Sequence, residues 1–210
     1  MNGKRIGRRT VALRTPPSVL SFANIGGRME GQGPLAKYFD ELCEDSFFGE
    51  KTWEKAESAM QERVLRRALE QAGLAPDELD YVLAGDLLNQ CIGSSFGLRD
   101  FSIPFFGLYG ACSTMGESLA LAAMLIDGAQ ASSHFCTAER QYRMPVPYGS
   151  QRTPTAQWTA TAAGCTLLSA QGPGPYITYV TCGKIVDKGI TDPNNMGAAM
   201  APAAYDTLRA

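Results

Sequence analysis

The chain has 210 residues, of which 45% are hydrophobic and 19% are charged, and its formal net charge at pH 7 is −2. This composition excludes a disordered chain and describes a globular protein with a sizeable core. The balanced charge argues against nucleic acid as a partner. No stretch reaches the roughly 18 apolar residues of a transmembrane segment and no signal peptide is recognisable, so any membrane association is expected to be peripheral.

Cysteine and histidine usage gives no basis for a metal site. The six cysteines are spread along the chain without a CxxC pair, which indicates no short disulfide framework. The single histidine, His134, has no neighbouring ligand cluster, so we expect no metal. No GxxxxGK(S/T) or GxGxxG motif is present to hold a nucleotide, and we expect no cofactor. The amino end is basic from Lys4 to Arg14, with no acidic residue before Glu30. A solvated arm is the simpler interpretation, and contact with acidic lipid or a partner is the alternative.

The first regular elements are a β-rich start and a long helix. Basic and β-branched residues alternate over 4–25, and a short apolar segment then ends in a glycine-rich loop. Thr52 is a favourable N-cap for the clearest helix, because apolar residues recur four apart from Ala56 to Ala72. Gly73 is expected to end this helix.

Strands and helices then alternate. A short strand over 81–84 ends in a Gly-Asp turn, followed by a helix over 87–98, a buried aromatic strand near Phe105 and another helix through Ile126. This order predicts parallel strands joined by right-handed crossovers. The last helix is apolar around nearly its whole circumference, which predicts burial on all its sides.

The junction before that last helix carries the most reactive candidate, Cys112. The aromatic run breaks at Gly110, and Ser113 and Thr114 offer caps, so Cys112 is expected near the first helical turn. Free backbone N–H groups and the helix dipole favour a thiolate there, as a nucleophile or in an anion site. A buried core cysteine is the alternative, and the residues alone leave both open.

The remainder is less regular. After Gly128 the sequence is polar over 132–161, which predicts a long loop carrying functional groups. A strand is expected over 162–169, with 176–186 as its antiparallel neighbour, and a helix begins at Met196.

Eight short strings form a specific combination, and the two longest are the most distinctive. They are Gly33-Pro-Leu, Ala84-Gly-Asp-Leu-Leu-Asn-Gln90, Ile103-Pro-Phe, Gly110-Ala-Cys-Ser-Thr114, Ser132-Ser-His-Phe-Cys-Thr-Ala-Glu-Arg-Gln141, Tyr148-Gly-Ser-Gln151, Asp187-Lys-Gly-Ile-Thr-Asp192 and Met196-Gly-Ala-Ala-Met-Ala-Pro-Ala-Ala204. Together they resemble the stage V sporulation protein AD family of the thiolase-like superfamily, over nearly the entire chain.

The resemblance implies an α/β, thiolase-like fold with layered αβα architecture, mostly the N-terminal half of the αβαβα fold. Residues 1–175 would form the N-terminal half, and 176–210 the first strand and the start of the first helix of a truncated C-terminal half. A family strand of about five residues between the buried helix and Ser132 is expected to be absent.

The resemblance also implies a function. Family members resemble dipicolinic acid-binding proteins for uptake into the developing spore, with or without calcium. They would work with other stage V sporulation A proteins, peripherally on the cytoplasmic side of the forespore inner membrane, without nucleic acid. A homodimer or a missing C-terminal half would complete the fold. Turnover is not expected, because the residues that complete a thiolase site come from beyond this chain.

Dipicolinate is a flat dianion, so its pocket calls for hydroxyls, amides and a guanidinium. Arg140 is the candidate carboxylate clamp, with a salt bridge to Asp86 or Glu139 as the alternative. His134 is expected to line the pocket or to be structural, not to act as a base. The expected ligand-binding residues are Cys112, Ser113, Asp86, Asn89, Ser133, His134, Thr137 and Arg140.

Two other functions stay open. The first is a thiolase or ketoacyl-synthase type acyltransferase that uses Cys112 as its nucleophile, although that requires a base and an oxyanion site as well. The second is a truncated fragment that acts only through protein contacts.

Overall fold

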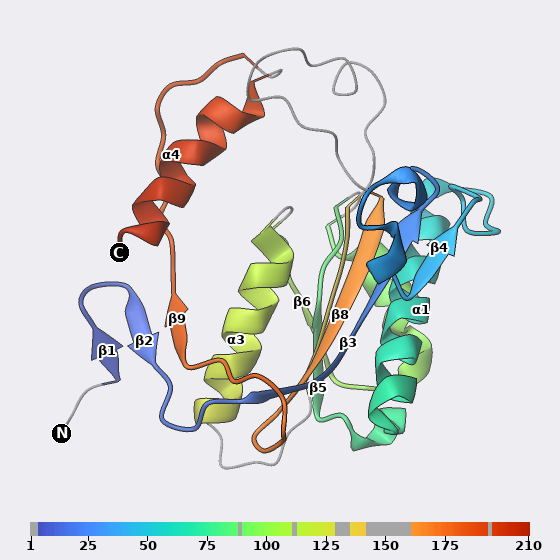
Figure 1. Ribbon diagram of the computed structural model, residues 1–210, viewed down its shortest axis with the longest axis horizontal. Coiled ribbons are helices and arrows are strands. Elements are labelled where there is room, and N and C mark those ends of the chain that lie inside the picture. Colours follow the sequence, from blue (N-terminus) through green and yellow to red (C-terminus); the bar gives the residue numbers. More distant parts are fainter. Residues whose placement is uncertain (1–3, 88–89, 111–112, 129–134, 142–160, 193–194) are drawn as a thin grey trace. The chain divides into compact units, whose positions relative to one another are not determined.

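The computed structural model describes residues 4–87, 90–110, 113–128, 135–141, 161–192 and 195–210 (Figure 1). The chain divides into two compact units. The larger unit comprises 15–142 and 160–177, and the smaller one comprises 1–14, 143–159 and 178–210. The expected division into related halves at 175/176 stays a prediction.

A six-stranded mixed sheet forms the centre of the larger unit, in the order β4-β3-β8-β7-β5-β6. β5 pairs in parallel with β6, as the alternation predicts, and also with β7. β3 pairs in parallel with β4, whereas β8 runs antiparallel to β3 and β7. The strands are β3 (Ser18–Gly27), β4 (Glu41–Cys43), β5 (Tyr81–Ala84), β6 (Phe105–Gly107), β7 (Phe135–Gln141) and β8 (Ala162–Ser169).

Helix α1 (Trp53–Ala72) covers one face of this sheet, and its predicted ends are confirmed. The Thr52 side chain accepts a hydrogen bond from the backbone N–H of Lys55, and Gly73 ends the helix with a φ of 69°. The apolar stripe packs on β3 and β8, and α2 (Ile92–Leu98) packs on α1. Four short 3₁₀ turns also occur in the described part of this unit: η1 (Glu30–Gln32), η2 (Ala36–Tyr38), η3 (Pro76–Glu78) and η4 (Arg99–Phe101).

Helix α3 (Thr114–Gly128) lies on the opposite face of the sheet from α1, which gives the expected αβα layers (Figure 1). Successive side chains of a strand point to opposite faces of the sheet, so there is one hydrophobic core on each face. Val82 packs on the α1 side, and Leu83 packs with Ile126 on the α3 side. The expectation that α3 is buried on all sides is wrong. Leu121 and Leu125 are 37% and 38% exposed, because the sheet of this unit covers one face of the helix only.

The expected loop over 132–161 begins instead with a central strand. β7 lies between β8 and β5, with Ala138 opposite both Cys165 and Ala84. It is the next described element after α3 and begins at Phe135. The expected absence of a family strand before Ser132 stays a prediction, because 129–134 lie outside the described residues. The sequence pattern does not indicate a strand here, because Thr, Glu, Arg and Gln leave the segment 135–141 without an apolar run. Cys165 is disulfide-bonded, which the cysteine spacing did not predict.

Two further expectations about local structure are corrected. The aromatic segment near Phe105 forms only the short edge strand β6, whose residues are all exposed, so it is not a buried strand. The helix expected over 87–98 begins at Ile92, because the preceding residues turn: Gln90 and Cys91 have φ values of 36° and 73°.

The described residues of the smaller unit form a three-stranded antiparallel sheet and one helix. Its strands are β1 (Arg5–Ile6), β2 (Thr10–Ala12) and β9 (Tyr179–Thr181), in that order. β9 pairs with β2, so the expected pairing of 176–186 with 162–169 is wrong. Helix α4 (Met196–Leu208) starts where predicted, capped by Asn195, whose side chain accepts from the backbone N–H of Ala198. Among the described helices, none has the length and apolarity to cross a membrane.

Candidate functional site

The site begins where β5 ends, at Gly85. The backbone N–H of Leu108 donates to the Ala84 carbonyl at 2.8 Å, which brings the segment after β6 against this turn. A Cβ on Gly85 would collide with the Leu108 carbonyl and lie 2.7 Å from Cγ2 of Thr114. Only glycine therefore allows the end of β5, the Leu108 segment and the start of α3 to meet this closely.

Asp86 follows and is almost completely buried, with an exposed fraction of 1%. One of its oxygens accepts from the Cys91 N–H at 3.1 Å, and the other accepts from the N–H and the hydroxyl of Ser94, both at 3.0 Å. These bonds fix the turn before α2 and compensate the buried charge. Asp86 thus orders neighbouring donors, and its part in ligand binding stays a prediction.

Two polar side chains of α1 form hydrogen bonds with the backbone of this turn. The Glu57 carboxylate accepts from the Leu87 N–H at 3.1 Å, and the Gln61 amide donates to the Gly85 carbonyl at 3.1 Å. Both side chains are fully buried. Neither residue is among those predicted from the sequence, although polar residues four apart beside the apolar positions of a helix are a recognisable signal.

The amino end of α3 lies beside this turn, because Thr114 is the residue that a Cβ on Gly85 would meet at 2.7 Å. Ser113 is exposed, and its N–H and hydroxyl both donate to the Gly110 carbonyl, at 3.0 and 2.7 Å. Thr114 is fully buried, and its hydroxyl has no hydrogen-bond partner in the part of the chain that the structure describes; the same holds for Oε1 of Gln61. The first-turn N–H groups and this hydroxyl are suited to an anion.

The other expected site residues divide into two groups. Thr137 and Arg140 belong to β7: Thr137 lies opposite Leu83 of β5, and Arg140 lies two residues beyond Ala138, which is opposite Ala84. Because β5 and β7 are parallel, the Arg140 backbone is at the same sheet edge as Gly85. Cys112, Asn89, Ser133 and His134 lie outside the described residues.

Cys91 is a second thiol beside this turn. Its Sγ donates to the Leu108 carbonyl at 3.2 Å, and burial, reinforced by the charge of Asp86, raises the pKa of the Cys91 thiol. A raised pKa keeps the thiol protonated and makes it a poor nucleophile. No three His, Cys, Asp or Glu side chains gather as a metal site among the described residues.

A family model and a curated relative both match the sequence, and both point to the same family. A family model described as "Stage V sporulation protein AD (SpoVAD)" matches residues 7–210. The chain is 42% identical over 214 residues to stage V sporulation protein AD of Bacillus subtilis strain 168, a match that covers 98% of this chain and 63% of that protein. The chain thus spans less than two thirds of this relative.

Solved structures show the fold. A priming β-ketosynthase from the R1128 polyketide biosynthetic pathway is similar with a TM-score of 0.53 and 18% identity, over 80% of this chain and 54% of that one. The 3-oxoacyl-[acyl-carrier-protein] synthase III of Aquifex aeolicus VF5 is similar with a TM-score of 0.50 and 15% identity, over 73% and 53%. The predicted thiolase-like α/β fold is thereby confirmed.

Proposed function

Because the chain belongs to the stage V sporulation protein AD family, we propose that this thiolase-like sporulation protein binds dipicolinic acid for its uptake into the developing spore. The observation that carries the proposal is the amino end of α3, where the buried Thr114 hydroxyl has no partner among the described residues. A dianion placed there meets first-turn N–H groups and a spare hydroxyl.

The charge of Asp86 is held inside the protein. Three donors from Cys91 and Ser94 stabilise its carboxylate and fix it in the turn, so a dianion has to gain its affinity from other donors that outweigh this charge. Arg140, at the same sheet edge by register, supplies the cation for one ligand carboxylate, and Cys112 contributes to the pocket floor. Binding without turnover is the proposed activity.

Calorimetric titration with dipicolinate tests the proposal. We expect the parent chain to bind, Cys112→Ala to bind more weakly, and Arg140→Ala to lose at least tenfold in affinity, because a charge-assisted bond is removed. Arg99→Ala is the matched control, since this exposed arginine pairs with Asp100 on the surface of the same unit. A well-folded parent that does not bind would refute the proposal.

An acyltransferase that uses Cys112 is the second candidate, favoured by the position of Cys112 two residues before α3. Incubation with an acyl-CoA and mass spectrometry of the Cys112 peptide separates it from pure binding. Covalent acylation of the parent supports the transferase, and an unmodified Cys112 supports binding.

For the assembly, we propose a homodimer formed through the edge strand β6. Phe105, Phe106 and Tyr109 are 37%, 45% and 59% exposed beside backbone groups that an edge strand leaves unpaired. Phe106→Glu is expected to shift sedimentation toward the monomer. We also propose a peripheral location on the cytoplasmic side of the forespore inner membrane, with other stage V sporulation A proteins as partners.

A further inference from the structure

The smaller unit contains a basic pocket that the proposed function does not use. It has a volume of about 410 Å³ and lies between the segment after β9 and α4. Its charged and aromatic lining consists of Arg9, Lys188, Tyr205, Asp206 and Arg209.

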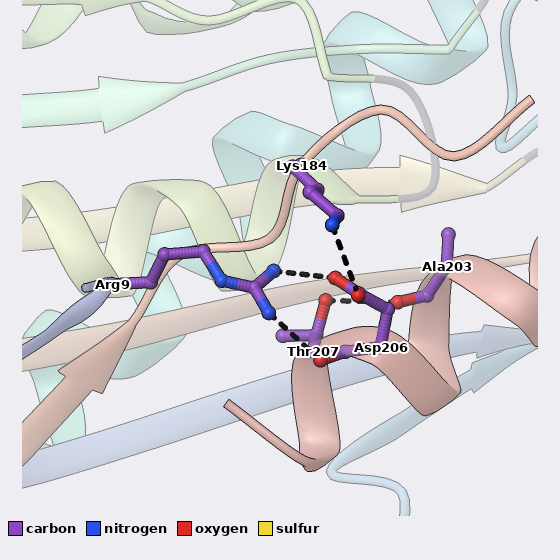
Figure 2. Close-up of polar contacts among 5 residues, drawn as sticks. All are labelled: Arg9, Lys184, Ala203, Asp206 and Thr207. Atoms are coloured by element: carbon purple, nitrogen blue, oxygen red, sulfur yellow. Dashed lines mark hydrogen bonds and ion pairs between the residues drawn. The ribbon is translucent and has the colours of Figure 1, made fainter. Parts of the chain in front are cut away.

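Asp206 is the centre of an ion network that joins three segments of this unit. Arg9 donates to the Asp206 carboxylate at 2.5 Å and to its backbone carbonyl at 3.0 Å, and Lys184 lies 3.3 Å from the other carboxylate oxygen (Figure 2). Both oxygens therefore face cations. The single carboxylate in the pocket lining is therefore already paired with Arg9 and Lys184.

The other two cations of the pocket lack an acidic partner. Lys188 and Arg209 are exposed, and neither forms an ion pair within the described part of the chain. Arg209 donates to the Tyr205 hydroxyl at 2.6 Å, and its guanidinium lies 5.4 Å from the Tyr205 ring centre. These contacts hold the guanidinium plane in place while leaving other N–H donors available.

Positive charge exceeds negative charge both in the pocket lining and in the rest of the smaller unit. The pocket lining holds Arg9, Lys188 and Arg209 against Asp206, which is a formal charge of +2. Lys184, bound to Asp206 from outside the lining, adds one more positive charge nearby. Asp187 is a nearby acidic residue, and its carboxylate accepts from the Gly189 N–H at 2.7 Å. By sequence, the segments of the smaller unit carry ten Lys and Arg against three Asp, which gives +7 in a chain whose total is −2.

We propose that this pocket binds a phosphate group, with Lys188 and Arg209 as its ligands. A guanidinium offers two parallel N–H donors to phosphate oxygens, and an ammonium adds a point charge. Ile185 and Leu208, each next to a pocket residue in the chain, are 97% and 87% exposed. Apolar side chains beside a basic site favour a phosphate carried by a lipid headgroup. The proposal does not rest on dipicolinate binding, because it uses the other unit.

The test compares two double variants with the same loss of charge. Lys188→Gln/Arg209→Gln removes the pocket cations, and Lys51→Gln/Arg99→Gln removes two exposed cations from the larger unit. Arg99 is a close match for Arg209, because it also lies 5.4 Å from an aromatic ring centre, that of Phe96. The full chain is titrated with inorganic phosphate by calorimetry, and is sedimented with vesicles of equal parts phosphatidylglycerol and phosphatidylcholine.

We expect the pocket variant to lose at least tenfold in affinity for the probe that the parent binds, and the control variant less than threefold. Vesicle binding identifies a lipid headgroup as the source of the phosphate, and binding of inorganic phosphate alone identifies a free phosphate compound. The proposal is overturned if the parent binds neither probe, or if both variants lose equal affinity, since the effect is then net charge. Dipicolinate titration of the same variants is expected to match the parent.

Discussion

The turn at the end of β5 depends on a single carboxylate, and Asp86→Ala tests that dependence. The substitution removes the acceptor of three hydrogen bonds, from the Cys91 N–H, the Ser94 N–H and the Ser94 hydroxyl. Bonds to a charged acceptor contribute about 1.5–3 kcal/mol each, and donors left buried carry their desolvation cost. Since some of these donors regain partners on relaxation, we expect a loss of about 3–5 kcal/mol in the free energy of unfolding.

Urea unfolding of the parent, Asp86→Ala, Asp86→Asn and Asp100→Ala provides the assay. Asp86→Asn retains an acceptor oxygen and should cost about 1–2 kcal/mol. Asp100→Ala is the control, because that side chain is 74% exposed and pairs only on the surface with Arg99. If Asp86→Ala unfolds within about 0.5 kcal/mol of the parent, the carboxylate does not organise this turn.

The same substitution has a chemical consequence at Cys91. The charge of Asp86 is the second cause, after burial, of the raised pKa of the Cys91 thiol. Asp86→Asn should therefore lower the pKa of Cys91 toward its usual value of 9.0, and alkylation of the Cys91 peptide should reach its half-maximal rate at lower pH. An unchanged alkylation profile would show that burial alone sets this pKa.

Further predictions concern particular positions. Gly85→Ala should lower the free energy of unfolding by more than about 2 kcal/mol, because its Cβ meets the Leu108 carbonyl. Gly116→Ala, inside α3 with nothing within 4 Å of the new Cβ, should instead raise it by about 0.5–1 kcal/mol, and equal effects would contradict the packing argument. Thr52→Ala should cost about 1 kcal/mol through loss of the α1 cap, as measured by chemical unfolding. The Arg9 contact lowers the pKa of Asp206 below 3.8, so its stabilisation is present above pH 3.8 and is lost as pH falls through the lowered pKa; acid unfolding of Arg9→Gln should lack this component.

The extent to which sequence determines these features differs between local and non-local structure. Thr52 and Gly73 define the ends of α1 because capping depends on neighbouring residues only. β7 was missed because its polar residues enter the centre of the sheet through pairing with β5 and β8, which no local pattern encodes. The partner of β9 was assigned wrongly for the same reason, since β2 is far away in the chain.

The residues of the candidate site also divide into those with a local sequence signal and those whose role depends on distant contacts. Gly85 and Asp86 were recognisable because a turn after a short strand is a local signal. Glu57 and Gln61 were overlooked because their importance comes from the loop that they meet, more than twenty residues further along the chain. A search for buried polar residues beside the apolar stripe of a predicted helix would have found both.

The near-zero net charge of the chain conceals a segregation that distinguishes the two proposed sites. The larger unit carries nine Lys and Arg against 18 Asp and Glu, and the smaller unit ten against three. A dianion that enters the larger unit is repelled at long range, so its affinity has to come from short-range donors such as the Thr114 hydroxyl and the α3 N–H groups. A phosphate group at the smaller unit is attracted at long range. Because the screening length falls from about 30 Å at 0.01 M salt to about 8 Å at 0.15 M, added salt should weaken phosphate or vesicle binding strongly and leave dipicolinate binding unchanged or stronger.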